Sequence, residues 1–515
     1  MPKPAARPTS KPVAAPPTGP RPTGSSAGAG DGFWFFLRQP AQRRDLWGLA
    51  ASFALLYAVV HYCYPYPLIT EDSPNYVKCA LDNTYGGYRP MGYSWFLQGF
   101  HFFSGRIVFV GATQYWLYAL ATAYFLLTVK YFFPPRRPWL FYLFAGGMVL
   151  SPVALYLTHW LMSDSVFAAL TLGWLSTGLW LLRRVSWLLA ALHVAALVLA
   201  IQVRFIGLFY PFFTAAGLLL AHRWAVRALA VSAASLFAAY LVYHSVVRES
   251  YRLFRVESFS GFSGWAAANN ATAILPYIQL DPQTLAADPE LEMVHRTLAA
   301  LPDTLYSERN VMCTSFIWSR VTGGKLVMVQ NMPLFSNNYL STWIYTGEQL
   351  NRYASYLVRH YPLQYARYFL WMNFRNMLHP VYKVLSPKYH EAPATGIFAQ
   401  YYDLDGVTRF TARYDVVAHI QPLLSVSALV LWALVALAGA VAWGRRRALQ
   451  LTVAQRRAVG WLLGFLAAYL AASLVAHPVH LRYLLPVHGL QLFVLYLAAQ
   501  ALLPGPSATT APGAV

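Results

Sequence analysis

Ionisable residues of this 515-residue chain lie at the ends of its apolar segments. Glu71 and Asp72 directly follow a long apolar run, and Asp164 opens another. Arg204 lies between two short apolar runs, and Arg482 comes just before the last one. A carboxylate can take a proton from a hydroxyl group as a general base, and an arginine suits a phosphate, which its guanidinium can hold with two hydrogen bonds. These residue types indicate a site that binds a phosphate and activates a hydroxyl.

Each of these residues also has a structural explanation. Asp72 or Ser73 could cap a helix, and Asp164 could do the same at the start of its apolar run. Arg89 has no acidic residue nearer in the sequence than Asp82. It could therefore hold a phosphate, or it could simply reach the lipid headgroups. No spacing of His, Asp, Glu or Cys in the sequence suggests a metal site.

The elements that must position these residues are membrane helices. The chain is 57% hydrophobic and 11% charged, and this charged fraction is less than half of what a soluble domain carries. Runs of eighteen or more apolar residues predict transmembrane helices, so we predict an all-α polytopic membrane protein. The ten expected spans are 46–64, 107–132, 139–157, 165–182, 186–203, 205–221, 226–247, 422–443, 458–476 and 483–503.

The distribution of basic residues predicts which side of the membrane each loop faces. With a cytoplasmic N-terminus, the cytoplasmic segments hold 19 Lys and Arg residues and the short outer loops hold five. Because Lys and Arg concentrate on the cytoplasmic side, the N-terminus is expected in the cytoplasm. The ionisable residues at the ends of the spans are then expected on the outer side of the membrane. The net charge of +20 is then explained by the basic cytoplasmic loops, which face the anionic lipids of the membrane. We therefore expect no nucleic-acid partner.

The chain divides into five expected parts. They are a disordered cytoplasmic tail with an interfacial anchor (1–45), a seven-span membrane module (46–247), an extracytoplasmic soluble segment of mixed structure (248–420), three C-terminal spans (421–503) and a short tail (504–515). The first outer loop is expected to contain an interfacial helix. The apolar stretch 363–378 contains arginines, which are costly at the bilayer centre, so it predicts a helix on the membrane surface. Cys79 and Cys313 both fall outside, where they could form a disulfide or remain free thiols.

Four stretches resemble motifs of the GT-C glycosyltransferases, multi-span enzymes that use sugars linked to polyprenyl phosphate. They are EDSPNYVKCA followed by GGYRPMGYSWFL, then LMSDSVF, RFIGLFYP and HLRYLLP. Their order and sidedness are most similar to the branch of protein O-mannosyltransferases and lipid A aminoarabinose transferases. The resemblance runs through the membrane core and leaves out the tail and most of 248–420. It implies an inverting transfer at the outer face, from a polyprenyl-phosphate sugar to a glycan, lipid or protein acceptor.

The resemblance also implies roles for individual residues. Asp72 matches the general base. In this chain Glu71 precedes Asp72, whereas the mannosyltransferases place Asp first in this acidic pair, so Glu71 is an alternative base. Asp164 matches the acid that helps to orient the acceptor or the base. Further candidates for substrate binding in or beside the same motifs are Arg89, Arg204, Arg482, Tyr76, His159, His480 and Tyr483. The lipid-linked sugar is the expected donor substrate, and no cofactor or metal is implied. The expected location is the bacterial inner membrane.

Two other functions fit a membrane protein of this kind. A transporter or lipid flippase would usually have ionisable residues near the midplane of its spans, or internal repeats. The ten predicted spans carry no Lys, Arg, Asp or Glu at their centres, and the sequence shows no internal repeat. A non-catalytic scaffold that binds a partner through 248–420 would make the acids at the span ends dispensable. We therefore predict the transferase.

Overall fold

The computed structural model describes residues 33–280, 285, 287–314, 316–318, 323–382, 385 and 391–503. Residues 1–32 of the predicted disordered tail and the predicted short tail 504–515 lie outside these ranges. The chain forms two units, Met1–Trp47 and Gly48–Val515. In the first unit, the described residues form helix α1 (Phe33–Arg38), where the interfacial anchor is predicted, and the start of helix α2 (Pro40–Cys63).

Membrane helices make up most of the second unit. Eight helical stretches in the described ranges are long and apolar enough to cross a membrane, so the protein is an all-α polytopic membrane protein, as predicted. They are α2, α6 (Pro138–Val149) with α7 (Pro152–Leu157), α8 (Ser163–Arg183), η1 (Phe205–Phe209) with α10 (Tyr210–His222), α11 (Val226–Phe254), α20 (Val416–Gly444), α21 (Val453–Ala476), and the run of α22 (Leu481–Leu484), η8 (Leu485–Val487) and α23 (His488–Leu502).

Two further predicted spans form helices that are less apolar or shorter. Helix α9 (Trp187–Val203) has 17 residues. Helix α5 (Val108–Phe132) contains Gln114, Thr122 and several tyrosines, which lower its hydropathy. Because Gln114 and Thr122 are fully buried, these polar groups are kept out of lipid by the protein itself. Both α5 and α9 pack against α8, the most deeply placed of the spans together with α23.

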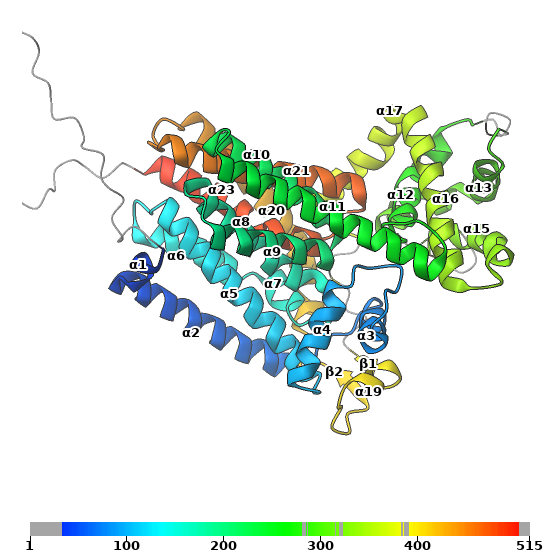
Figure 1. Ribbon diagram of the computed structural model, residues 1–515, viewed down its shortest axis with the longest axis horizontal. Helices are drawn as coiled ribbons and strands as arrows, with labels where there is room; N and C mark the ends of the chain where they lie inside the picture. Colours follow the sequence, from blue (N-terminus) through cyan, green and yellow to red (C-terminus); the bar gives the residue numbers. More distant parts are fainter. Residues whose placement is uncertain are drawn as a thin grey trace, which may run out of the picture. The chain divides into compact units, whose positions relative to one another are not determined.

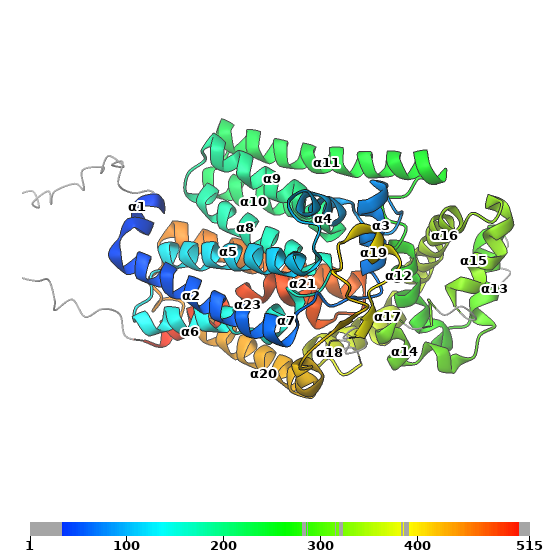
Figure 2. The same ribbon diagram turned by 90° about the horizontal axis from the view of Figure 1, so that it is seen from below.

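The predicted soluble segment is mostly helical. Helix α11 continues past the predicted boundary at residue 247, and helices α12 to α16 then gather at one end of the bundle of the second unit (Figures 1 and 2). These elements are α12 (Ser263–Ala271), η2 (Thr272–Tyr277), α13 (Pro289–Ala299), η4 (Asp303–Tyr306), α14 (Glu308–Cys313), α15 (Gly324–Asn331), η5 (Met332–Phe335) and α16 (Tyr339–His360).

The last part of this segment returns the chain to the bundle. The predicted surface helix at 363–378 is a run of α17 (Pro362–Tyr365), the π-helical turn η6 (Ala366–Leu370) and α18 (Trp371–Leu378), and it is not among the candidate membrane spans. It is followed by strand β1 (Glu391–Pro393), helix α19 (Ile397–Tyr401) and strand β2 (Arg409–Thr411). The two strands pair antiparallel, with Ala392 opposite Phe410.

Helices α12 and α16 form a close pair because glycines face one another between them. A Cβ atom on Gly264 would overlap the carbonyl group of Gly347, so only glycine permits this approach. Beside this contact the rings of Trp265 and Trp343 stack with their centroids 4.1 Å apart. The pair is therefore a firmly packed wall, and one face of it borders the candidate site.

The predicted first outer loop contains two short helices where one interfacial helix is predicted. These are α3 (Ser73–Asp82) and α4 (Gly92–Phe103), which pack against each other. A Cβ atom on Gly92 would lie 2.5 Å from the backbone of Gln202, so glycine lets the start of α4 touch the end of α9. This contact brings the first loop next to the residue that follows α9, Arg204.

Candidate active site

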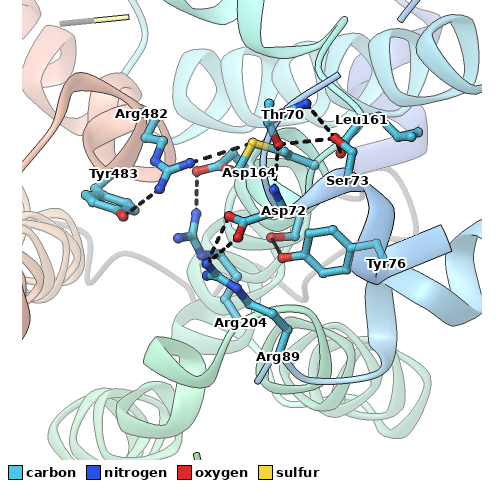
Figure 3. Close-up of polar contacts among 12 residues, drawn as sticks. Thr70, Asp72, Ser73, Tyr76, Arg89, Leu161, Asp164, Arg204, Arg482 and Tyr483 are labelled. Atoms are coloured by element: carbon cyan, nitrogen blue, oxygen red, sulfur yellow. Dashed lines mark hydrogen bonds and ion pairs between the residues drawn. The ribbon is translucent and has the colours of Figure 1, made fainter. Parts of the chain in front are cut away.

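Five charged residues from distant parts of the sequence come together at one end of the membrane bundle. Asp72 precedes α3, Arg89 lies between α3 and α4, and Asp164 is in the first turn of α8. Arg204 follows α9 and Arg482 belongs to α22. Figure 3 shows their side chains pointing toward one another. We call these five residues the charged cluster.

Backbone contacts between two loops hold Asp72 near the start of α8. The amide of Leu68 donates to the carbonyl of His159 at 2.8 Å, and the amide of Leu161 donates back to the carbonyl of Leu68 at 3.0 Å. The hydroxyl of Ser73 then donates to the carbonyl of Leu161 at 2.9 Å and accepts from the amide of Thr70 at 2.8 Å. Ser73 is fully buried, so these hydrogen bonds fix the backbone beside Asp72.

Asp72 forms an ion pair with Arg89. One terminal nitrogen of Arg89 lies 2.9 Å from each of the two carboxylate oxygens of Asp72. The two side chains are 28% and 18% exposed, respectively. Asp72 occupies the N-cap position of α3, but its carboxylate makes no capping hydrogen bond. The structure therefore gives this carboxylate an arginine partner instead of the capping role that was considered from the sequence.

Asp164 forms the second ion pair, with Arg204. Its side chain is only 1% exposed, while that of Arg204 is 16% exposed. The N-cap position of α8 belongs to Met162, so Asp164 does not cap this helix either. Its second oxygen, Oδ2, is buried and has no hydrogen-bond partner among the described residues. A buried carboxylate oxygen without a donor is costly, so the ion pair with Arg204 has to stabilise this side chain.

Arg482 differs from the other two arginines because it has no ion-pair partner in the described ranges. One of its terminal nitrogens donates to the hydroxyl of Tyr483 at 2.8 Å, and the other lies 3.6 Å from the sulfur of Met162. The ring of Tyr483 also lies beneath Arg204, whose guanidinium carbon is 5.1 Å from the ring centroid. With three arginines and two aspartates, the charged cluster has a net charge of +1.

The surroundings keep the Asp72–Arg89 pair ionised. Burial opposes ionisation of Asp72, but the positive charges of Arg89, Arg482 and Arg204 outweigh it, so the pKa of this carboxyl lies below its ordinary value. Burial likewise opposes the charge of Arg89, and the nearby Asp72 raises the pKa of Arg89 above its ordinary value. Asp72 is therefore a carboxylate at neutral pH, and it is a weak base while Arg89 is paired with it.

A pocket of about 590 Å³ adjoins the charged cluster. Arg89, Arg204 and Tyr483 line it, and each contacts one member of the cluster that is not in the lining: Asp72, Asp164 and Arg482, respectively. No Asp or Glu is among the lining residues. Much of the remaining lining consists of small apolar side chains of α12, α16 and α21, namely Ala266, Ala267, Ala354, Val358, Ala472, Val475 and Ala476.

The other residues predicted from the sequence have varied surroundings. Tyr76 lines the pocket, and its hydroxyl is 3.0 Å from that of Ser163. The ring of His480 is 5.6 Å from that of Tyr483. His159 is buried against the rings of Tyr57 and Tyr115 and is not among the lining residues. Glu71 is exposed, and the structure records no hydrogen bond or ion pair for it.

Most lining residues are not among the site residues predicted from the sequence, and three of them bear directly on the charged cluster. Phe262 lies beneath Arg89, with 4.8 Å between the guanidinium carbon and the ring centroid. Ser163 and His477 also line the pocket. Burial, and next the charge of Arg204, lowers the pKa of His477 to about 3, so this histidine is neutral at physiological pH. Phe262 carries no signal in the sequence, whereas Ser163 directly precedes Asp164 and His477 lies three residues before His480 at the mouth of the last span.

Two negative findings concern other kinds of site. Within the described ranges, no group of three or more His, Cys, Asp or Glu side chains is placed to hold a metal ion. Cys79 and Cys313 do not form the disulfide that is one of the two possibilities.

Comparisons with known proteins identify no family for this chain. No protein-family model matches it, and no curated protein does. Among solved structures, it is similar to the crystal structure of ArnT from Cupriavidus metallidurans bound to undecaprenyl phosphate. The two chains are 12% identical, the match covers 88% of this chain and 77% of ArnT, and the TM-score is 0.31. A TM-score this low supports no functional inference, so the proposal below depends on the charged cluster and the pocket.

Proposed function

We propose that this protein is an inverting glycosyltransferase of the GT-C type. It would move a sugar from a polyprenyl-phosphate donor to an acceptor at the outer face of the membrane, in a bacterial inner membrane with the N-terminus in the cytoplasm. The observation that carries the proposal is Arg482. It is a third arginine without an ion-pair partner in the described ranges, and it lies beside two arginine–aspartate pairs at a pocket.

The charge of the cluster suits the proposed donor. A sugar joined to a lipid through one phosphate is a phosphodiester with a single negative charge, which balances the net +1 of the cluster. Arg89 and Arg204 are partly exposed to the pocket and can donate to its phosphate oxygens. Arg482 supplies the unbalanced charge from behind Tyr483. Without an anion, this partly buried site keeps an excess positive charge, which is unfavourable.

The apolar lining suits the lipid part of the donor. The lining residues of α21 belong to the last two turns of a candidate membrane span, so this side of the pocket would face the lipid. Small side chains such as Ala267, Ala354 and Ala472 leave room for an extended hydrocarbon chain. Ligand pockets commonly combine a mostly apolar wall with a few polar groups that fix orientation. A polyprenyl phosphate has matching parts, an apolar chain and one charged head.

The two aspartates would have different roles in the transfer. Asp72, the more exposed of the two, would take the proton from the acceptor hydroxyl, whose oxygen attacks the anomeric carbon of the sugar. The bond between this carbon and the phosphate oxygen breaks, and its electron pair stays with the phosphate. The arginines stabilise this developing negative charge, so no general acid is needed. Asp164, which is buried and paired with Arg204, would hold this arginine in position at the pocket.

Turnover of a polyprenyl-phosphate sugar tests this proposal. The full-length protein in lipid nanodiscs would be mixed with the labelled donor and with a cell-envelope extract that supplies the acceptor. We expect the wild type to release free polyprenyl phosphate and Arg482→Ala to lose this activity. Arg106→Ala is the matched control, because Arg106 is an exposed arginine of the first loop whose nearest acid is Asp405, outside the cluster. If the wild type consumes no donor, or Arg482→Ala is as active as the control, the proposal is wrong.

A further inference from the structure

Arg89 has to serve two anions. Its terminal nitrogen contacts both oxygens of Asp72, and the same side chain lines the pocket. The aromatic ring of Phe262 supports its guanidinium from one side. A phosphate in the pocket therefore competes with Asp72 for the hydrogen bonds of Arg89. Whenever the phosphate wins, Asp72 loses its only ion-pair partner in the described ranges and becomes a stronger base.

The proposed reaction changes the charge of the lipid phosphate. The donor is a phosphodiester with one negative charge, and the released polyprenyl phosphate is a monoester with two negative charges above its second pKa of about 6. With Asp72 ionised, the cluster balances the donor and leaves the product with one excess negative charge. With Asp72 protonated, the cluster has a charge of +2 and balances the product. Excess charge in a partly buried site is unfavourable, so the product favours the protonated form.

Among the groups in and around the charged cluster, Asp72 is the one that can change its protonation when the charge of the phosphate changes. The groups that face it are Tyr76 on α3, Arg89 in the loop after α3, Arg204 after α9, and Arg482 on α22, which binds the hydroxyl of Tyr483. The arginines stay charged. Nearby, the half-buried His477 between α21 and α22 is neutral, and Asp164 on α8 is 1% exposed and paired with Arg204. Asp72 is 28% exposed, so it can exchange a proton with water.

We propose that Asp72 is protonated when a polyprenyl monophosphate occupies the pocket and ionised when the pocket is empty or holds the phosphodiester donor. This inference rests on the proposed function. The proton comes from the acceptor hydroxyl during transfer and moves to the Asp72 carboxylate, while the electron pair of the broken carbon–oxygen bond moves to the phosphate. When the product leaves, Asp72 gives this proton to water and pairs with Arg89 again. In the reverse direction, binding of the product takes up one proton.

Calorimetry with short, soluble lipids tests the coupling. Farnesyl phosphate is the monoester probe and its methyl diester is the probe with one charge. Each is titrated into full-length protein in nanodiscs at pH 7, in two buffers that differ in ionisation enthalpy, which gives the number of protons exchanged. We expect the monoester to bind with uptake of about one proton by linkage and the diester to bind with almost none.

Two variants assign this proton. Asp72→Asn should abolish the uptake, together with the carboxylic acid band that we expect in the infrared difference spectrum of the wild type with farnesyl phosphate. Asp82→Asn is the matched control, because Asp82 is the last residue of α3, the helix that Asp72 precedes. Asp82 pairs with Lys78, outside the charged cluster, so this variant should behave like the wild type. The coupling is wrong if the wild type takes up no proton, or if Asp72→Asn retains the uptake or the band.

Failure of the proposed function would look different. If farnesyl phosphate does not bind, or binds equally well to Arg482→Ala, then the charged cluster is not a lipid-phosphate site and both proposals are wrong. If binding depends on Arg482 but involves no Asp72-dependent proton, then only the coupling is wrong and the proposed function remains.

Discussion

Replacing Asp72 with asparagine removes one negative charge and almost nothing else. The two side chains have nearly the same shape, and the carboxylate makes no capping hydrogen bond that the amide would have to replace. The main lost interaction is the ion pair with Arg89. Solvent-exposed ion pairs contribute only about 0–1 kcal/mol to stability. Loss of this partly buried pair costs more, but Asp72→Asn should still fold and insert into the membrane.

The effect on turnover should be much larger than the effect on stability. A positioned general base contributes about 10²–10⁴-fold, which corresponds to a transition-state stabilisation of about 3–5 kcal/mol. We therefore expect Asp72→Asn to lower kcat by about 10²–10⁴-fold. The affinity for the donor should stay the same or increase, because Arg89 no longer has an acid that competes with the phosphate.

The assay measures kcat and the dissociation constant for the donor separately, with Glu71→Gln as the matched control. Glu71 is adjacent to Asp72 but exposed and without a recorded partner. Its charge is largely screened by water, so Glu71→Gln should keep kcat within about threefold of the wild type. Full turnover in Asp72→Asn with an inactive Glu71→Gln would make Glu71 the base. Full activity in both variants would refute a catalytic role for this acidic pair.

Three further predictions concern the phosphate, the lipid chain and the topology. Arg482→Ala removes one positive charge a few ångströms from the phosphate and should weaken binding of farnesyl phosphate by about 10–100-fold. Arg106→Ala should not change it, and equal affinities in calorimetry would contradict this prediction. Ala472→Trp should fill the apolar part of the pocket and weaken binding of a long polyprenyl phosphate by about tenfold or more. Ala471→Trp, at an exposed position of the same helix, should bind this lipid like the wild type. Equal binding to both variants would exclude the lipid chain from this part of the lining. In a variant without the native cysteines, single cysteines placed in loop 444–457 should resist a membrane-impermeant reagent in intact cells and those in α16 should react; the opposite pattern would invert the topology.

The sequence predicts where charges can lie in this fold more reliably than it predicts which charges pair. Apolar runs identify the membrane helices, and ionisable residues are tolerated only near their ends. Residues at the ends of neighbouring antiparallel helices then meet at one depth. This reasoning anticipates that Arg89, Arg204 and Arg482 approach one another, and the structure brings their side chains together.

The pairing itself depends on packing that the sequence does not reveal. Asp72 meets Arg89, seventeen residues away, because Ser73 binds the carbonyl of Leu161 and orients the start of α3. The sequence offers Asp72 as a helix cap, since residue type and position both suit a cap. In the structure, the nearby arginines are stronger partners for the carboxylate than the backbone amides of α3.

The wall of the pocket is similarly hidden in the sequence. It depends on the approach of α12 to α16 through Gly264 and Gly347, which are ordinary glycines in the sequence until the two helices are seen together. Phe262, which supports Arg89, lies 173 residues after it in the chain. Long-range contacts of this kind follow from tertiary packing and not from local periodicity.

The most direct test of the central claim is an experimental structure of the full-length protein with a polyprenyl phosphate bound. We predict that the phosphate lies against Arg89 and Arg204, near Arg482, and that Arg89 has turned away from Asp72. The hydrocarbon chain should follow the alanines of α12, α16 and α21. A phosphate bound elsewhere, with the Asp72–Arg89 pair unchanged and Arg482 facing lipid, would contradict the account.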